Sequence, residues 1–331
     1  MKITIITSIR NLLLKDSGFI PTPLFTIHSH PSEKERIIDK TFMNCLGIKA
    51  IHSLRQNMFA YQIIEIDESV KDKAAIIEEL NLKTYSTAKA IESFLLFLWF
   101  VKDNSLSGDD TYGYVSEAYP CGFVANHTIY SNSSGLFESI EFSEEEFNRA
   151  ISILFKYMEV SPDKTIDEEA KVFLSDNTDI QGKDIYKSGV SYIDKKNNLQ
   201  RAIYFLSTVR GVPFLPLKIS FYMPLLESLF SCGEKYHVLK KVSKRVAHYI
   251  AKQDDERNEI IGTISEAYDI RSRFLHGETL DSDETKLEYL KQLSNRIDKV
   301  VRAALTKVIM EDSQSFLQPD PKQFLNSLAI L

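Results

Sequence analysis

Near the end of a long predicted helix, an arginine and a histidine lie five residues apart, at Arg271 and His276. An imidazole can take or give a proton near neutral pH. A guanidinium can pair with two phosphate oxygens and stabilise the charge that develops on them. Together these side chains suit cleavage of RNA without a metal ion, in which the ribose 2′-hydroxyl attacks its own phosphate. DNA lacks that hydroxyl and would stay intact.

The helix that positions this pair is predicted over 255–276, with Gly277 as the residue after its end. An apolar row recurs along it at helical spacing, formed by Ile260, Ile264 and Ala267. Continuing that row places Arg271 where a side chain faces a neighbouring element. Five residues of ideal helix span about 7.5 Å along the axis and about 140° around it, so one helix does not aim both side chains at one atom. A frayed helix end, or a second copy across a two-fold axis, could bring them together.

The same residues have a purely structural interpretation. Arg271 could form an ion pair with a neighbour on its own helix, either Asp269 or Glu266. His276 would then be only a polar residue at a helix end. The spacing alone does not decide between the two interpretations.

The C-terminal third of the chain resembles the HEPN superfamily, and most of all its ApeA-like branch. The blocks that carry the resemblance are LESLF at 226–230, RVA at 245–247 and the run from Tyr268 to Gly277, which includes Arg271, Ser272 and His276. Their order and spacing agree with that branch, and Arg271 and His276 fit its Arg-x4-His signature. The similarity covers about 199–310.

This resemblance implies a helical domain that forms a homodimer, with Arg271 and His276 of both copies in one cleft. Members of the family are mostly metal-independent endoribonucleases of phage-defence, abortive-infection and toxin systems, and they often cleave tRNA or other host RNA. It therefore implies an RNA substrate, no cofactor and no metal. Some HEPN domains have lost catalysis and serve only in RNA binding or dimerisation, and that remains the alternative.

The expected ribonuclease activity suggests roles for other residues. Glu227 lies in a strongly apolar segment, where an unpaired charge is costly. It could orient Arg271 or His276, or pair with a structural arginine. Ser272 and Tyr268 flank the pair as supporting residues, Tyr268 being expected in a core or interface. The basic residues expected to bind the RNA backbone, with a solvated surface as the alternative, are Lys240, Lys241, Lys244, Arg245 and Arg273.

Five helical segments are predicted in the C-terminal half, which makes it an all-α bundle. They cover 199–210, 214–230, 234–251, 255–276 and 285–310, the last capped by Asp281 or Ser282. Pro224 should kink or divide the second of them. The tail at 311–331 contains Pro319 and Pro321, so it is expected to be irregular until about 324.

The N-terminal half mixes strands and helices, which predicts an α+β domain. Strands rich in β-branched and aromatic residues are expected at 23–28, 59–66 and within 112–130. A buried helix capped by Ser86 is expected to reach about Lys102, and Ser143 with Glu146 forms a capping box for a helix over 144–158. The predicted division is an α+β sensor or regulatory domain at 1–160, a linking region at 161–196, the all-α HEPN domain at 197–310 and the tail at 311–331.

Charge divides the chain in the same way. Residues 1–194 hold 19 basic and 29 acidic side chains, whereas residues 195–310 hold 20 and 14. A basic half favours a nucleic-acid partner, although the acidic half could equally dock on it and silence it. A phage-derived trigger or an antitoxin is the partner expected at the N-terminal domain.

Several other classes of function are disfavoured. Three widely spaced cysteines form no disulfide framework or zinc ribbon and suit a reducing cytosol. The longest apolar run has eight residues against the roughly 20 of a membrane span, so a cytoplasmic protein without membrane contact is expected. Motifs for nucleotide, dinucleotide or hydrolase chemistry are absent. His28, Ser29 and His30, with Glu33 and Glu35, form only a weak candidate for a metal site, because nothing nearby completes a ligand set.

Overall fold

The computed structural model describes residues 1–15, 18–28, 35–38, 40–66, 73–115, 121–126, 128–161, 197–234, 236–278, 286–318 and 320–330. This part of the chain forms two compact units. The sheet unit consists of described residues within 1–129 and 138–152, and the helical unit of those within 130–137, 153–161 and 197–330. An α+β part followed by a largely helical part is therefore confirmed. The helical unit also takes in 130–137 and the second half of one helix that the sequence assigns to the N-terminal domain, and 162–196 lie outside the described residues.

The sheet unit is organised around β1 (Lys2–Arg10), a strand that the sequence analysis did not predict. It pairs antiparallel with β5 (Met58–Glu65) on one side and with β6 (Ser107–Val115) on the other. The six-stranded sheet has the order β3-β4-β5-β1-β6-β7. Its outer strands are β3 (Phe19–Pro21), β4 (Thr26–His28) and β7 (Cys121–Val124). The predicted strands at 23–28, 59–66 and 112–130 correspond to β4, to β5 and to parts of β6 and β7.

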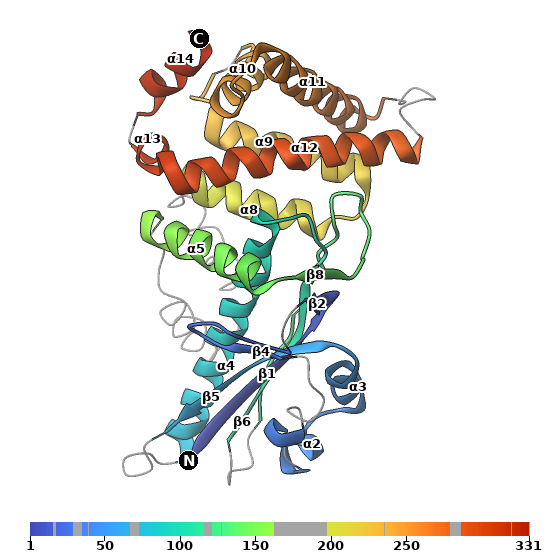
Figure 1. Cartoon of the computed structure of the whole chain (residues 1–331), viewed down its shortest axis with the longest axis vertical. Coiled ribbons are helices and arrows are strands. Elements are labelled where there is room, and N and C mark those ends of the chain that lie inside the picture. The colour runs from blue at the N-terminus through green and yellow to red at the C-terminus, as the bar shows by residue number, and fades with distance from the viewer. Residues whose placement is uncertain are drawn as a thin grey trace. The chain divides into compact units, whose positions relative to one another are not determined.

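Helices cover both faces of this sheet (Figure 1). On one face α4 (Lys73–Phe97) places Leu80 in a cluster with Ile3 and Ile5 of β1. On the other, α2 (Lys40–Cys45) and α3 (Ile48–Gln56) pack in a cluster that contains Ile6. Because successive side chains of a strand point to opposite faces, β1 serves two separate cores.

Two glycines allow α4 to lie directly on the sheet. A Cβ atom at Gly113 would stand 2.0 Å from the Thr84 hydroxyl oxygen, and one at Gly122 would stand 2.8 Å from it. The predicted start of this helix at Ser86 is wrong, since α4 begins at Lys73. The Ser86 hydroxyl instead donates to the carbonyl of Leu82 inside the helix (2.8 Å), which is a common alternative to capping for serine.

A second, smaller sheet pairs β2 (Leu12–Leu14) in parallel with β8 (Ile140–Phe142). The next helix, α5 (Glu144–Val160), opens with the predicted capping box. The Ser143 backbone N–H donates to the Glu146 carboxylate (2.9 Å), and the Glu146 N–H donates to the Ser143 hydroxyl (3.3 Å).

All five helices predicted for the C-terminal half are present. They are α8 (Asn198–Gly211), α9 (Leu215–Phe230), α10 (Val238–Ile250), α11 (Asp254–His276) and α12 (Leu287–Lys307). The central one is α9, which contacts the other four, and Figure 1 shows α12 lying across it. Pro224 lies inside α9 without dividing it. The predicted caps Asp281 and Ser282 lie outside the described residues, and Lys286 precedes α12.

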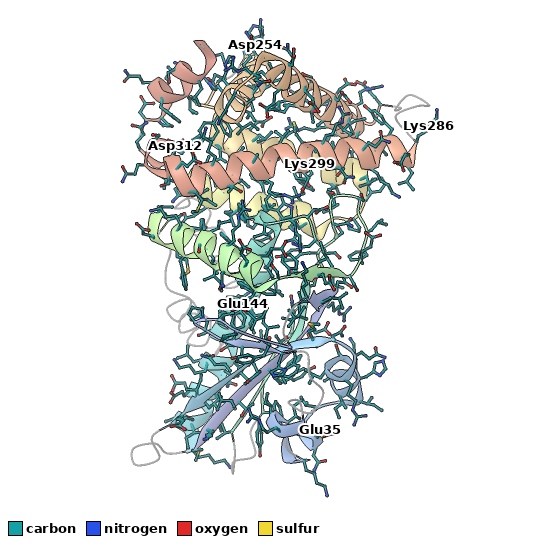
Figure 2. The ribbon with its side chains drawn as sticks, viewed as in Figure 1. Glu35, Glu144, Asp254, Lys286, Lys299 and Asp312 are labelled. Atoms are coloured by element: carbon teal, nitrogen blue, oxygen red, sulfur yellow. The ribbon has the colours of Figure 1, made fainter. Side chains whose placement is uncertain are left out.

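The prediction that the tail is irregular until about 324 is wrong for the residues that directly follow α12. A π-helical turn (Val308–Asp312) continues α12 into α13 (Ser313–Leu317), and α14 (Lys322–Ile330) follows. Phe316 is buried against the rings of Phe230 and Tyr249, each at 5.3 Å between centroids. The Tyr249 hydroxyl donates to Asp312 (3.0 Å), the π-turn residue labelled in Figure 2. The tail is thus part of the helical unit, because its apolar side chains complete a shared aromatic cluster.

Candidate active site

The end of α11 carries the two residues that the sequence singled out. The helix begins with three acidic residues and has Arg273 and His276 in its last turn, charges that suit the helix dipole at each end. Gly277 ends it with a φ of 74°, a left-handed conformation that glycine adopts without strain. The N–H of Glu278 then donates to the carbonyl of Arg273 (2.9 Å). The predicted helix end is confirmed.

Arg271 lies at the edge of the buried face rather than within it. The apolar row of α11 continues from Ala267 to the buried Ile270, and the Arg271 side chain is 28% exposed. Its Nη1 donates to Glu227 Oε1 of α9 at 3.1 Å. The guanidinium carbon also lies 5.5 Å from the centroid of the Tyr268 ring, one turn earlier on α11. Two helices therefore orient this arginine.

The ion pair between Arg271 and Glu227 selects one of the options that the sequence left open. Glu227 pairs with Arg271, whereas the two carboxylates offered by the structural interpretation have other partners. Asp269 pairs with Arg273 (2.8 Å), and Glu266 pairs with Arg296 of α12 (2.5 Å). Among the described residues no hydrogen-bond acceptor lies at Nε or Nη2 of Arg271. Those nitrogens remain able to meet a phosphate.

His276 is the last residue of α11 and is exposed. No hydrogen bond or ion pair to its imidazole is recorded within the described ranges, and none joins it to Arg271. The neighbouring Leu275 is 57% exposed, while Phe274 packs on Phe214 at the start of α9 (5.7 Å between ring centroids). A single chain thus places the arginine and the histidine at one helix end without a hydrogen bond between them.

The other predicted residues of this segment differ in accessibility. Ser272 is half-buried. Tyr268 is half-buried beside Arg271, a supporting position rather than a fully buried core position. Arg273 pairs with Asp269 one turn earlier on the helix. Its positive charge is therefore partly neutralised, which weakens its attraction for a phosphate.

Arg245 is the clear correction among the predicted RNA-binding residues. Its side chain is 1% exposed, so it cannot reach a phosphate in the folded protein. It donates to the carbonyl of Phe230 (2.8 Å), to Glu234 (2.7 Å) and to Asn326 of α14 (2.8 Å). Buried charges persist where they are paired in this way, and Arg245 joins α9, α10 and α14 instead of meeting a ligand.

Three lysines of α10 remain as the exposed part of that predicted surface. Lys240, Lys241 and Lys244 all lie on the exposed side of the helix. In the described part of the chain, an ion pair is found for Lys241 alone of the three, with Glu234 Oε1 at 3.8 Å. The predicted basic surface is therefore reduced to these three ammonium groups.

The weak candidate for a metal site at His28 and His30 cannot be assembled from what the structure describes. The His28 ring lies between those of Phe19 (5.6 Å) and Phe59 (6.0 Å), and residues 29–34 lie outside the described residues. In the described part of the chain, no group of three or more His, Cys, Asp or Glu side chains could hold a metal ion. Nor does any helix described there combine the length and apolar character needed to span a membrane.

One group of polar residues escaped the sequence analysis. In the sheet unit the carboxylate of Asp109 accepts hydrogen bonds from Ser8 and Arg10 of β1 and from Ser53 of α3. No spacing motif could have revealed them, because the chain separates them by as many as 101 positions.

Comparison with known proteins adds no relative: no protein-family model, curated protein or solved structure matches this chain.

Proposed function

We propose that the chain is a metal-independent endoribonuclease of the HEPN type, with Arg271 and His276 at the reacting phosphate. The observation that carries this proposal is the ion pair between Arg271 and Glu227, which holds a partly exposed guanidinium on the helix that ends at the exposed His276. The residues from Tyr268 to Gly277, through their resemblance to ApeA-like HEPN proteins, supply the class of reaction.

In the proposed reaction, a His276 imidazole takes the proton of the ribose 2′-hydroxyl. The 2′-oxygen then bonds to phosphorus, and the bond from phosphorus to the 5′-oxygen breaks. The departing oxygen receives a proton from an imidazolium, which restores the histidine. Arg271 donates to the phosphate oxygens and stabilises their added negative charge. The products are a 2′,3′-cyclic phosphate and a 5′-hydroxyl.

A two-fold dimer would bring Arg271 of one copy and His276 of the other to the same phosphate. Two observations support this arrangement. Within one chain no hydrogen bond joins the two side chains, and the exposed Leu275 beside His276 offers an apolar residue for a self-complementary interface. The lysines Lys240, Lys241 and Lys244 would attract the RNA backbone.

The biological setting that we propose is phage defence, abortive infection or a toxin system, in which the enzyme cleaves host or phage RNA such as tRNA. The sheet unit would then receive the activating signal or an antitoxin. Expression of the wild-type chain should damage cellular RNA and slow growth. The His276→Ala chain should do neither. The experiment compares cells with and without phage.

The decisive experiment uses the purified full chain, mixed RNA and EDTA. Wild-type protein should produce fragments with cyclic-phosphate and 5′-hydroxyl ends, and DNA of matching sequence should stay intact. His276→Ala should lose this activity by about 10²–10⁴-fold. Glu278→Ala, an exposed change two residues further on, is the matched control and should cleave normally.

The alternative is a non-catalytic module that binds RNA or dimerises, and the three exposed lysines of α10 are the feature that favours it. It predicts a salt-sensitive gel shift with RNA that stays intact. That result, from wild-type protein that still forms its dimer, would overturn the ribonuclease.

A further inference from the structure

The sheet unit contains a polar pocket built on an irregularity of its central strands. Thr7 of β1 pairs with Thr111 of β6, but Ile9 pairs with Gly108, so Asp109 and Asp110 both stand opposite Ser8. This is a β-bulge, a feature that re-aims side chains and occurs often beside binding sites. The Thr7 hydroxyl lies within hydrogen-bonding distance of the carbonyls of Asp109 (2.9 Å) and Asp110 (3.1 Å). The Thr7 side chain therefore stabilises the bulge.

Both bulge carboxylates are held in place. Asp109 accepts from the hydroxyls of Ser8 (2.7 Å) and Ser53 and from Nε of Arg10. Its side chain is 15% exposed, whereas that of Arg10 is 43% exposed. Because the described residues provide an acceptor only for Nε of Arg10, the outer edge of its guanidinium can still meet an anion.

Asp110 is fixed by two donors. The backbone N–H of Asn126 donates to its Oδ1 (3.0 Å), and the Tyr112 hydroxyl also hydrogen-bonds to it. Burial, together with the negative charges of Asp110 and Asp109, raises the pKa of Tyr112 to about 12. Tyr112 therefore stays a neutral donor across the physiological range.

These groups line a cavity of about 580 Å³ between β1, β6 and α3. Lys49 and His52 face it from α3, three residues apart and so on the same side of the helix. Both are exposed, and the described residues provide no recorded hydrogen bond or ion pair for either. With Arg10, three cationic or proton-bearing groups thus line a pocket that also contains two fixed carboxylates.

We propose that this pocket binds a small phosphorylated sugar, free or as part of a mononucleotide. Arg10, Lys49 and His52 would hold the phosphate. A phosphate has more free oxygens than the two of a carboxylate group, so it suits three separate donors better. The Asp110 carboxylate would accept from the sugar hydroxyls. The volume lies in the range of small-molecule sites. Binding here is independent of whether the helical unit cleaves RNA.

The test is thermal unfolding and calorimetric titration of the full chain with four probes. These are ribose, inorganic phosphate, ribose 5-phosphate and AMP. The proposal predicts that ribose 5-phosphate, AMP or both raise Tm and bind, that ribose does not, and that inorganic phosphate binds more weakly. Binding of AMP alone would identify a nucleotide, and equal binding of both would identify the sugar phosphate as the recognised part.

Lys49→Ala and His52→Ala should each raise Kd about tenfold, the typical loss for a hydrogen bond to a charged group. Both residues are exposed, so these variants should fold normally. Arg55→Ala is the matched control, since Arg55 is exposed on α3 but does not line the cavity. Failure of both phosphorylated sugars to bind, or an equal effect of Arg55→Ala, would overturn the proposal.

Discussion

The helical unit contains two arginine–glutamate pairs that differ in their surroundings. Arg245 and Glu234 are 1% and 11% exposed, and the arginine has two further acceptors, one of them in the tail. Arg271 and Glu227 are 28% and 27% exposed, and the arginine has one carboxylate and one aromatic ring as neighbours. In the first pair three hydrogen bonds of the arginine serve the fold, and its remaining Nε is buried. In the second pair the arginine has one hydrogen bond among the described residues and stays partly exposed. Exposure of the unused donors, rather than residue type, marks the candidate site.

The largest effect on stability is expected at the buried pair. Arg245→Ala leaves Glu234 buried without its main partner and should lower the free energy of unfolding by about 3–5 kcal/mol. Urea denaturation of purified protein measures this. Lys244→Ala, the exposed neighbour, should change stability by no more than about 0.5 kcal/mol. A loss under about 1 kcal/mol for Arg245→Ala would show that the pair is not structural.

At the half-exposed pair the effects should be reversed. Arg271→Ala removes a donor to the reacting phosphate and should reduce RNA cleavage by about 10²–10³-fold. Stability should fall by at most about 1 kcal/mol, because the ion pair that is lost is partly solvated. Initial rates and urea denaturation on the same preparation test both statements. Unfolding of this variant would place Arg271 with Arg245 among the structural arginines.

Acid should weaken the buried pair. Burial raises the pKa of Glu234, but hydrogen bonds from Arg245 and from the Cys232 N–H, with the Arg245 charge, outweigh it and lower the pKa to about 2. A carboxyl with a lowered folded-state pKa stabilises the protein fully above its unfolded-state pKa, and loses that contribution as pH falls toward 2. Its share amounts to up to about 3 kcal/mol. The stability gap between wild type and Glu234→Gln should therefore shrink from pH 5 to pH 2; a constant gap would contradict this.

Glu227 should act as a positioning residue. Glu227→Gln keeps an acceptor for Arg271 but removes the charge, so we expect kcat to fall about tenfold with little change in KM. Stability should stay within about 1 kcal/mol of wild type. Unchanged kcat would mean that the ion pair does not orient Arg271 for cleavage.

The smallest effects are expected on the surface of α10. Each single replacement of Lys240, Lys241 or Lys244 by alanine should reduce the number of counterions released on RNA binding by about one. Gel shifts over a range of salt concentrations measure the slope. An unchanged slope for all three would remove α10 from the RNA-binding surface.

The sequence predicted those parts of the fold that local patterns determine. Helices α8 to α12 have apolar residues at helical spacing, and Gly277 marks one end, so five helices and that end are confirmed. Strand β1 escaped prediction because Ile5 to Ile9 are all buried, which removes the alternation that identifies a half-buried strand. The tail escaped because its helices gain stability from Phe230 and Tyr249, which are distant in sequence.

The site shows the same limit. The approach of Glu227 to Arg271 was one of several options in the sequence, and packing of α9 against α11 selected it. The burial of Arg245 was invisible, because it lies beside exposed lysines on an amphipathic helix. Its acceptor Asn326 lies 81 positions further along the chain, beyond the part of the tail that was expected to be irregular.

The π-helical turn at Val308–Asp312 determines which way the side chains of the last helices point around the helix axis. It holds about one residue more than an α-helical turn, and each α-helical residue advances by about 100°. Deleting one residue there would leave composition and charge almost unchanged, yet rotate Phe316 away from Tyr249 and carry Asn326 away from Arg245. The integrity of the helical unit thus depends on the number of residues in this turn as well as on their identity.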